Sequence, residues 1–120
     1  MRKVCIVVCV YNRADFIERC LNSVMSLEYK NFEIIVIDDG STDGTGEKIE
    51  SFKGKIELRV YQNKKNIGLM KSRNIGARMA DADIIAYIDS DCIVDKMWLK
   101  NLIMPFEQDD NIVIAGGRIL

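Results

Sequence analysis

The chain has 120 residues, of which 17 are basic and 18 are acidic, and it contains no histidine. This length suits one domain with a real core, and the formal charge of -1 is not gathered into basic runs, so nucleic acid is not an expected partner. Without histidine, no imidazole ligand and no Ser-His-Asp triad can form within these residues, which leaves carboxylates as the candidate catalytic and metal-binding groups.

The spacing of the cysteines and the lengths of the apolar runs bear on the compartment in which the protein is expected. Cys5, Cys9, Cys20 and Cys92 form no Cys-x-x-Cys pair and lie among apolar residues, which is typical of buried thiols in a reducing environment. No apolar run approaches the roughly 20 residues needed to span a bilayer, and the first residues lead straight into a strand without a signal-peptide pattern. We therefore expect a cytoplasmic protein, or one peripheral to the membrane, with no transmembrane segment.

Hydrophobic patterning predicts that strands and helices alternate. The apolar runs at 4–10 and 32–37 are short and rich in valine and isoleucine, as expected of buried strands. The run at 56–61 alternates apolar and polar residues, which indicates an edge strand. In chain order the expected elements are strand 4–10, helix 16–27, strand 32–37, helix 45–52, strand 56–61, helix 67–80, strand 83–89, a helix after Asp95, and strand 112–115.

Local signals refine these elements. Asp15 and Glu18 have the spacing of a capping box for the first helix. Gly76 lies among small residues that allow the third helix to approach a sheet closely, and Asp95 can cap the fourth helix, which has Pro105 near its end. The alternation predicts the α/β class, with a Rossmann-like open, mostly parallel sheet and helices on both faces.

The run at 83–89 ends in two acids with one residue between them, Asp89-Ser90-Asp91. The run is expected to be a parallel strand covered on both faces, and open α/β sheets bind ligands at the carboxyl ends of such strands. Asp89 and Asp91 can converge on one divalent cation where the turn ends the alternation of side chains. Their oxygens suit Mg²⁺ or Mn²⁺, which would bind a diphosphate. The alternative is a pair of solvated or capping acids.

Other strand ends carry groups that suit a nucleotide. One carboxylate of Asp38-Asp39 can bind a base or ribose hydroxyls, although a turn with a helix cap would explain the same residues. Tyr11 can stack on a base or lie at a rim. No glycine-rich phosphate loop is present, so Arg73, with Lys71 as a second candidate, is expected to neutralise the phosphates unless both are ordinary solvated charges.

Five segments share an order and spacing that extend over nearly the whole chain. They are Tyr11-Asn12, Ser23-Val24 with Tyr29, the run 35–45, Asn66-Ile67-Gly68 with the run 73–76, and Tyr87-Ile88-Asp89-Ser90-Asp91. Together they resemble the amino-terminal half of a family 2 glycosyltransferase with the A-type fold. The resemblance implies a truncated nucleotide-diphospho-sugar transferase fold and transfer of a sugar from a nucleotide diphosphate, usually UDP, to an acceptor hydroxyl.

The resemblance also implies roles for particular residues. Tyr11 and Asp39 would contact the nucleobase, and Asp38 would support that loop. Arg73 would lie near the donor, Asp89 would face the ribose or the sugar, and the metal, Mn or Mg, would be bound by Asp91 together with Asp89. The implied nucleotide-binding residues are Val10, Tyr11, Asn12, Asp38, Asp39, Arg73, Asp89 and Ser90.

The chain departs from the family pattern at three positions and in length. Cys9 stands where a proline is usual, Val10 replaces a small polar residue, and Cys92 replaces a frequent third acid. Family members carry the acceptor site and the catalytic base in a second half. Residues 1–120 are therefore expected to form a single nucleotide-sugar-binding domain with no assignable base and an unknown acceptor. The expected partners are a missing C-terminal half or a second copy of the chain, because the exposed final strand invites self-association.

Other functions stay open at this point. The run 89–93 nearly matches the Asp-x-Asp-x-[Thr/Val] box of haloacid-dehalogenase-like phosphatases, in which the first acid, here Asp89, is a nucleophile. That box normally follows the first strand of its domain. A response-regulator receiver would need an acidic pair where this chain has Tyr11-Asn12. A non-catalytic nucleotide-binding module is the third alternative.

Overall fold

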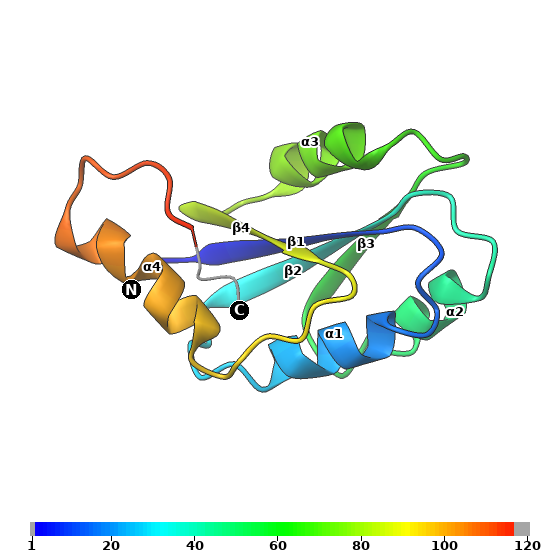
Figure 1. Ribbon diagram of the computed structural model, residues 1–120, viewed down its shortest axis with the longest axis horizontal. Coiled ribbons are helices and arrows are strands. Elements are labelled where there is room, and N and C mark those ends of the chain that lie inside the picture. The colour runs from blue at the N-terminus through cyan, green and yellow to red at the C-terminus, as the bar shows by residue number, and fades with distance from the viewer. Residues whose placement is uncertain (1, 117–120) are drawn as a thin grey trace.

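The computed structural model describes residues 2–116, in which strands and helices alternate along the chain (Figure 1). This order confirms the predicted α/β class. Across the described residues, no helix has both the length and the apolar character that crossing a membrane requires. The elements are β1 (Val4–Val10), α1 (Ile17–Met25), β2 (Phe32–Asp38), α2 (Thr45–Glu50), β3 (Leu58–Gln62), α3 (Leu69–Met79), β4 (Ile84–Asp89) and α4 (Trp98–Gln108).

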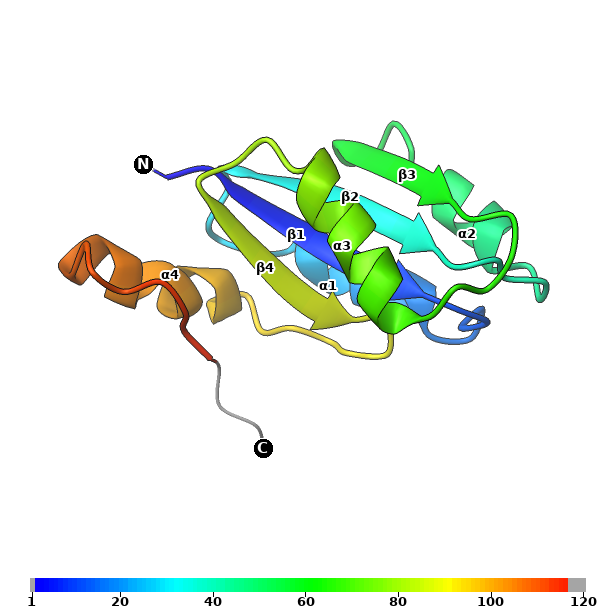
Figure 2. The ribbon, with the colours of Figure 1, turned by 90° about the horizontal axis from the view of Figure 1, so that it is seen from above.

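The four strands form one sheet in the order β3-β2-β1-β4, and every neighbouring pair is parallel. Figure 2 shows α3 lying over one face of the sheet, and Figure 1 shows α1 and α2 beneath the other face. The central strands β1 and β2 are almost entirely buried because helices cover both of their faces, which explains their continuous apolar runs. The strand predicted at 56–61 corresponds to β3, which lies at an edge as expected.

The helix α3 packs closely on β1 at Gly76. A Cβ atom at this position would lie 2.5 Å from Cγ1 of Val7, which is well inside van der Waals contact. Glycine therefore allows the close approach that the small residues of this helix predicted. The apolar side chains of Ile75 and Met79 pack against Val7 and Ile35 around this point.

The expectation that strand β4 is covered on both faces is wrong. Within the described residues β4 pairs with β1 alone and forms the second edge of the sheet. Its burial alternates, so that Ile84 is buried whereas Ile85 and Tyr87 are 38% and 43% exposed. The buried side packs with Leu99 and Ile103 of α4. An apolar run has the same composition whether one face or two are covered, which is why the sequence did not distinguish them.

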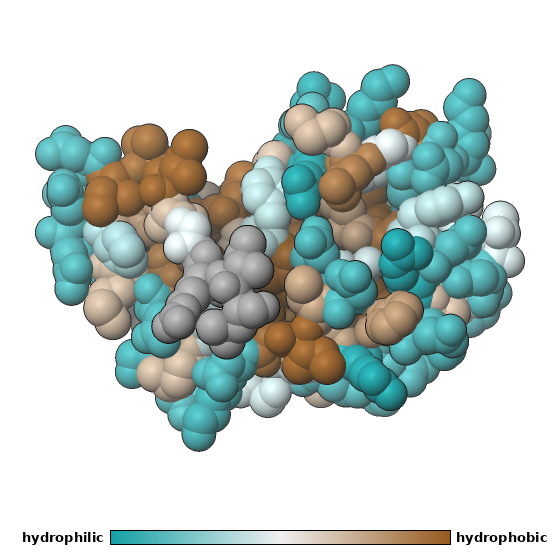
Figure 3. Space-filling view, viewed as in Figure 1, coloured by the Kyte–Doolittle hydropathy of each residue, from teal (hydrophilic) through white to brown (hydrophobic). Residues whose placement is uncertain are grey.

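The final strand expected at 112–115 is also wrong, because the described residues 112–116 form neither helix nor strand. Val113 and Ile114 are 84% and 85% exposed, and Figure 3 shows apolar surface over the segment that follows α4. β-branched residues favour a strand only where another strand can pair with them. The edges of the described sheet are therefore β3 and β4, and self-association through a last strand has no support in these residues. Residues 117–120 lie outside the described part of the chain.

Neither of the two predicted side-chain caps is present at the start of its helix. The capping box of Asp15 and Glu18 is wrong, because the N-cap of α1 is Phe16 and makes no side-chain cap. The carbonyl of Arg13 instead accepts the Ile17 N–H at 2.9 Å, so backbone begins this helix. The cap predicted at Asp95 is wrong as well, because the N-cap of α4 is Met97 and makes no side-chain cap. The Asp95 carboxylate accepts the Met97 N–H at 2.9 Å, in the turn that precedes the helix.

Glu33 is a buried acid that joins three parts of the structure on the α3 side of the sheet. Its Oε1 lies 3.3 Å from Nη2 of Arg59 on β3 and accepts the Asp81 N–H at 3.0 Å, and its Oε2 lies 3.7 Å from Nζ of Lys3. Burial alone would raise the pKa of Glu33, but the Asp81 N–H and the charges of Arg59 and Lys3 hold this pKa below its usual value.

The charge of Glu33 should therefore stabilise the fold. A depressed pKa contributes stability that is present above the unfolded pKa, about 4.5, and is lost as the pH falls through the folded value. We expect Glu33→Gln to lower the free energy of unfolding by about 1–2 kcal/mol at pH 7, since the basic partners remain half-exposed and can be solvated. Urea unfolding at pH 7 and at pH 3 would measure this. A difference between wild type and variant that stayed constant between these pH values would contradict it.

Candidate functional site

The candidate site lies at the carboxyl edge of the sheet, where β2, β1 and β4 end side by side. Cys9 on β1 is in register with Asp89, and Val10 is in register with Asp38. The Val10 carbonyl accepts the Asp39 N–H at 2.8 Å, which ties the ends of β1 and β2 together. Parallel strands thus bring together acids that are some 50 positions apart in the sequence.

A small cavity opens at this edge between the end of β1 and the beginning of α3. Its volume is about 250 Å³. Tyr11 lies at its rim and is 44% exposed, whereas Val10 is buried beneath it. A flat aromatic ring beside apolar walls suits a planar heterocycle. The residues that line the cavity are Cys9, Val10, Tyr11, Asp39, Asn66, Gly68, Leu69 and Ser72.

Asp39 lines this cavity, but most of its hydrogen-bonding capacity is used within the protein. The residue is only 4% exposed. Its Oδ1 accepts the Ile67 N–H at 2.8 Å and the Asn63 side-chain amide at 3.0 Å, and its Oδ2 accepts the Gly68 N–H at 3.0 Å. A carboxylate oxygen accepts two hydrogen bonds, so Oδ2 retains one acceptor position for a ligand. Asp39 therefore shapes the wall of the cavity and can also bind within it.

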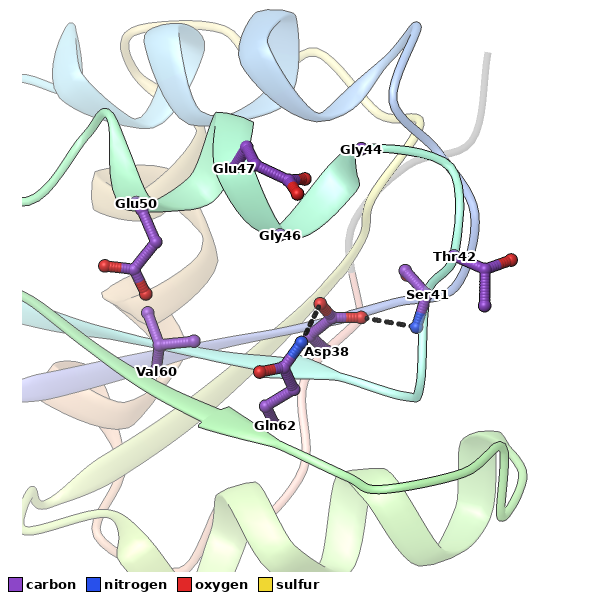
Figure 4. Close-up of a pocket in the computed structure, with 9 residues that line it drawn as sticks. All are labelled: Asp38, Ser41, Thr42, Gly44, Gly46, Glu47, Glu50, Val60 and Gln62. Atoms are coloured by element: carbon purple, nitrogen blue, oxygen red, sulfur yellow. Dashed lines mark hydrogen bonds between the residues drawn. The ribbon is translucent and has the colours of Figure 1, made fainter.

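Asp38 points to the other side of the sheet, because successive side chains of a strand alternate. It is 1% exposed and lines a separate cavity of about 320 Å³ between α2 and β3 (Figure 4). Its Oδ1 accepts the Ser41 N–H at 3.0 Å, and its Oδ2 lies 3.5 Å from Nε2 of Gln62. The structure thus places Asp38 away from the cavity that holds Tyr11 and Asp39, in a position that supports the loop after β2.

Asn12 connects the loops that follow β1 and β2. Its backbone N–H donates to Oγ of Ser41 at 2.9 Å, and its Oδ1 accepts the Thr42 N–H at 2.8 Å. Its φ of 50° is in the left-handed region, which asparagine tolerates better than most residues. Asn12 therefore lies next to the site predicted for it, with its side chain used to hold the two loops.

The acids that end β4 converge, as the turn after the strand predicted. The Cys92 N–H donates to the Asp89 carbonyl at 3.0 Å and closes a tight turn. Ligand atoms of Asp89, Asp91 and Cys92 all lie within 4.8 Å of one another, and all three residues are exposed. Two carboxylates with open positions around them are a donor set that fits a divalent cation such as Mg²⁺ or Mn²⁺. Ser90, between the acids, is buried.

Cys92 is the member of this group that was not among the predicted metal ligands. In the sequence it stands where the family pattern often has a third acid, and a thiol there does not by itself indicate a ligand. Burial raises the pKa of its thiol, and the charges of Asp89 and Asp91 raise the pKa further. Its Sγ–H donates to Oδ1 of Asp91 over 3.9 Å. Its position directly after the two acids, in a turn, was the available signal.

Arg73 of α3 reaches Asp89, the first of these acids. Its Nη2 lies 3.3 Å from Oδ1 of Asp89, and its guanidinium lies 5.6 Å from the centre of the Tyr87 ring. Burial raises the pKa of the Cys9 thiol to about 11. Cys9 lines the cavity and is in register with Asp89, so the cavity and the acidic turn lie side by side at this edge. Lys71, the other basic candidate, is exposed on α3.

Known proteins resemble this chain in both sequence and structure. The chain is 34% identical over 117 residues to an uncharacterized glycosyltransferase of Haemophilus influenzae, which covers 97% of this chain and 36% of that protein. The crystal structure of S. aureus TarS 1–349 in complex with UDP-GlcNAc matches with a TM-score of 0.82 and 31% identity, over 88% of this chain and 31% of that one.

A second structure is more distant. The mannosyltransferase PcManGT of Pyrobaculum calidifontis, in complex with GDP-Man and Mn²⁺, matches with a TM-score of 0.81 and 25% identity, over 85% of this chain and 31% of that one. The chain thus spans about a third of the length of each of these proteins. Residues 5–120 match glycosyl transferase family 2 along their whole extent. With an α/β fold shared with nucleotide-sugar transferases and a sequence match over nearly all of its length, the chain belongs to glycosyl transferase family 2.

Proposed function

We propose that residues 1–120 form the donor-binding part of a glycosyltransferase, which binds a nucleotide-diphosphate sugar of the UDP type together with Mn²⁺ or Mg²⁺. The observation that carries this proposal is the position of the Tyr11 cavity next to the Asp89-Asp91 turn at one edge of the sheet. A base in the cavity would direct its diphosphate toward the acids. Family membership removes the phosphatase and receiver alternatives, so the remaining alternative is a binding module without transferase activity.

Each part of the site has a role in this proposal. The Tyr11 ring stacks on the base, and Oδ2 of Asp39 accepts a base N–H through its remaining acceptor position. Arg73 supplies positive charge near the diphosphate, since its guanidinium already lies at Asp89. Asp38 and Asn12 hold the loops, and Val10 and Ser90 support the wall and the turn.

Glycosyl transfer leaves negative charge on the departing diphosphate, and this charge is what the site must stabilise. A divalent cation bound by Asp89 and Asp91 would supply that stabilisation. TarS has been crystallised with UDP-GlcNAc and is closer in sequence than the protein crystallised with GDP-Man, which favours a uracil base here. We infer no catalytic base and no acceptor site within residues 1–120, which span about a third of the length of the related proteins.

The four thiols of the described residues are all free, which suits a reducing compartment, and a cytoplasmic location is part of the proposal. Cys5 and Cys20 are fully buried, so a disulfide with another chain would have to disrupt the core to reach them. Sedimentation with lipid vesicles distinguishes this proposal from the peripheral-membrane alternative, in which the protein would sediment with the vesicles.

Calorimetric titration of UDP, first with EDTA and then with Mn²⁺, tests the proposed function. We expect UDP to bind about 10-fold more tightly with Mn²⁺, because the cation links the acids to the diphosphate. Uridine is the matched control, since it carries the base without phosphates and its binding should not respond to the metal. GDP reports on the choice of base. UDP binding that is absent, or that is equally strong with EDTA, would contradict the proposal.

A further inference from the structure

The turn that follows β4 presents a thiol together with the two acids. The Cys92 N–H donates to the Asp89 carbonyl at 3.0 Å and closes the turn. This bond fixes the backbone of Asp89 and Cys92, the first and last of the three residues. The Cys92 Sγ lies 3.9 Å from Oδ1 of Asp91, and the donor atoms of all three residues lie within 4.8 Å of one another. All three side chains are exposed, so a cation can reach them from solvent.

We propose that Cys92 is a third protein ligand of the divalent cation and makes this site select thiophilic ions over Mg²⁺. This inference rests on the proposed function, because it assigns a further ligand to the same metal site. Carboxylate oxygens bind Mg²⁺ and Mn²⁺, whereas a thiolate is a soft donor that favours Zn²⁺, Co²⁺ or Cd²⁺. On binding, the thiol proton is released to the solvent and the sulfur binds the ion as thiolate.

The distances allow such a group to close around one ion. With metal–sulfur bonds of about 2.3 Å and metal–oxygen bonds of about 2.1 Å, an oxygen and a sulfur on the same ion lie about 3.1–3.6 Å apart. The observed 3.9 Å between Cys92 Sγ and Asp91 Oδ1 needs only a small side-chain rotation to reach this range. Asp89 is shared with Arg73, whose Nη2 lies 3.3 Å from its Oδ1, so Asp91 and Cys92 are the stronger pair of donors.

A second thiol nearby supplies an internal control. Cys20 of α1 is fully buried, and its Sγ–H donates to the Asp89 backbone carbonyl over 3.7 Å. It therefore lies beneath the turn without facing the solvent, and it should not bind the ion. A thiol signal that depends on Cys92 but not on Cys20 would identify the exposed sulfur as the ligand.

Titration with Co²⁺, followed by near-ultraviolet absorption, tests the assignment directly, because a thiolate bound to Co²⁺ gives a charge-transfer band. We expect this band, at a stoichiometry of one ion, in wild type and in Cys20→Ala, and its loss in Cys92→Ser and in Asp91→Asn. Circular dichroism confirms that each variant is folded, and Cys92→Asp serves as a second variant that keeps three donors. A band that persists in Cys92→Ser would overturn the proposal, whereas one that persists in Asp91→Asn would support Cys92 as a ligand together with Asp89.

Ion selectivity gives a second readout that does not depend on activity. Calorimetry with Cd²⁺ and Mg²⁺ should show that Cys92→Ser lowers the ratio of Cd²⁺ to Mg²⁺ affinity by about 10-fold or more, and that Cys92→Asp lowers it further. An unchanged ratio would overturn the proposal. If Mn²⁺ strengthens UDP binding but no charge-transfer band forms, the role of Cys92 alone fails. If no ion binds and UDP binding ignores metal, the proposed function fails with it.

Discussion

Asp91→Asn is expected to abolish the effect of Mn²⁺ on UDP binding while leaving metal-free binding unchanged. Asp91 is exposed in the turn after β4, and the side-chain contact described for it is the long one from the Cys92 thiol, so the substitution should cost the fold little. An amide is a much weaker ligand for a divalent cation than a carboxylate. Removing a residue that only hydrogen-bonds to a metal ligand typically lowers metal affinity by about 10–100-fold. Removing the Asp91 carboxylate, which is proposed to bind the metal directly, should lower it by about 100-fold or more.

Calorimetry of UDP at a fixed, saturating Mn²⁺ concentration, compared with EDTA, measures this effect. The matched control is Asp110→Asn, because Asp110 is also an exposed acid and forms a peripheral ion pair with Arg2 at 3.4 Å. The control should bind UDP and Mn²⁺ as the wild type does. If Asp91→Asn kept the full enhancement by Mn²⁺, the cation would have to lie elsewhere, and the metal site would have to be reassigned.

The central strands could be predicted from the sequence because a strand that is buried on both faces is apolar at nearly every position. In β1 and β2 both faces are covered, so apolar residues run without interruption from Val4 and from Ile34. In β4 the exposed positions Ile85 and Tyr87 are apolar as well, so the alternation of burial has no matching alternation in residue type. Exposure there depends on which elements lie alongside, which local patterning does not contain.

The location of the candidate site could also be predicted, and the prediction came from the expected topology of the sheet and not from any one motif. Parallel strands bring their carboxyl ends to one edge, and this predicted that Tyr11, Asp39 and Asp89 would lie close together. The internal bonds of Asp39 were not predictable, because their donors at Asn63, Ile67 and Gly68 belong to a loop whose path is set by tertiary packing. Hydrogen-bond partners that are distant in sequence leave no periodic signal.

Asp39→Ala is expected to lower the free energy of unfolding by about 3 kcal/mol and to abolish UDP binding. The carboxylate is 4% exposed and accepts the N–H groups of Ile67 and Gly68 and the Asn63 amide, so its removal leaves three donors without their charged acceptor. A bond to a charged group contributes about 1.5–3 kcal/mol, but the two backbone donors are half-buried and water can replace part of the loss. Urea unfolding would measure the stability.

The two roles of Asp39, in the loop and in the base site, can be separated with Asn63→Ala. This variant removes one donor to Asp39 and the 3.3 Å contact from Asn63 to Ser72, but it leaves the Asp39 carboxylate in the cavity wall. It should lower stability by about 1 kcal/mol and change UDP affinity by less than about 3-fold, whereas Asp39→Asn, which keeps the shape but loses the charge, should weaken UDP binding by about 10-fold or more. Equal losses of affinity in Asn63→Ala and Asp39→Asn would mean that Asp39 acts only by shaping the loop.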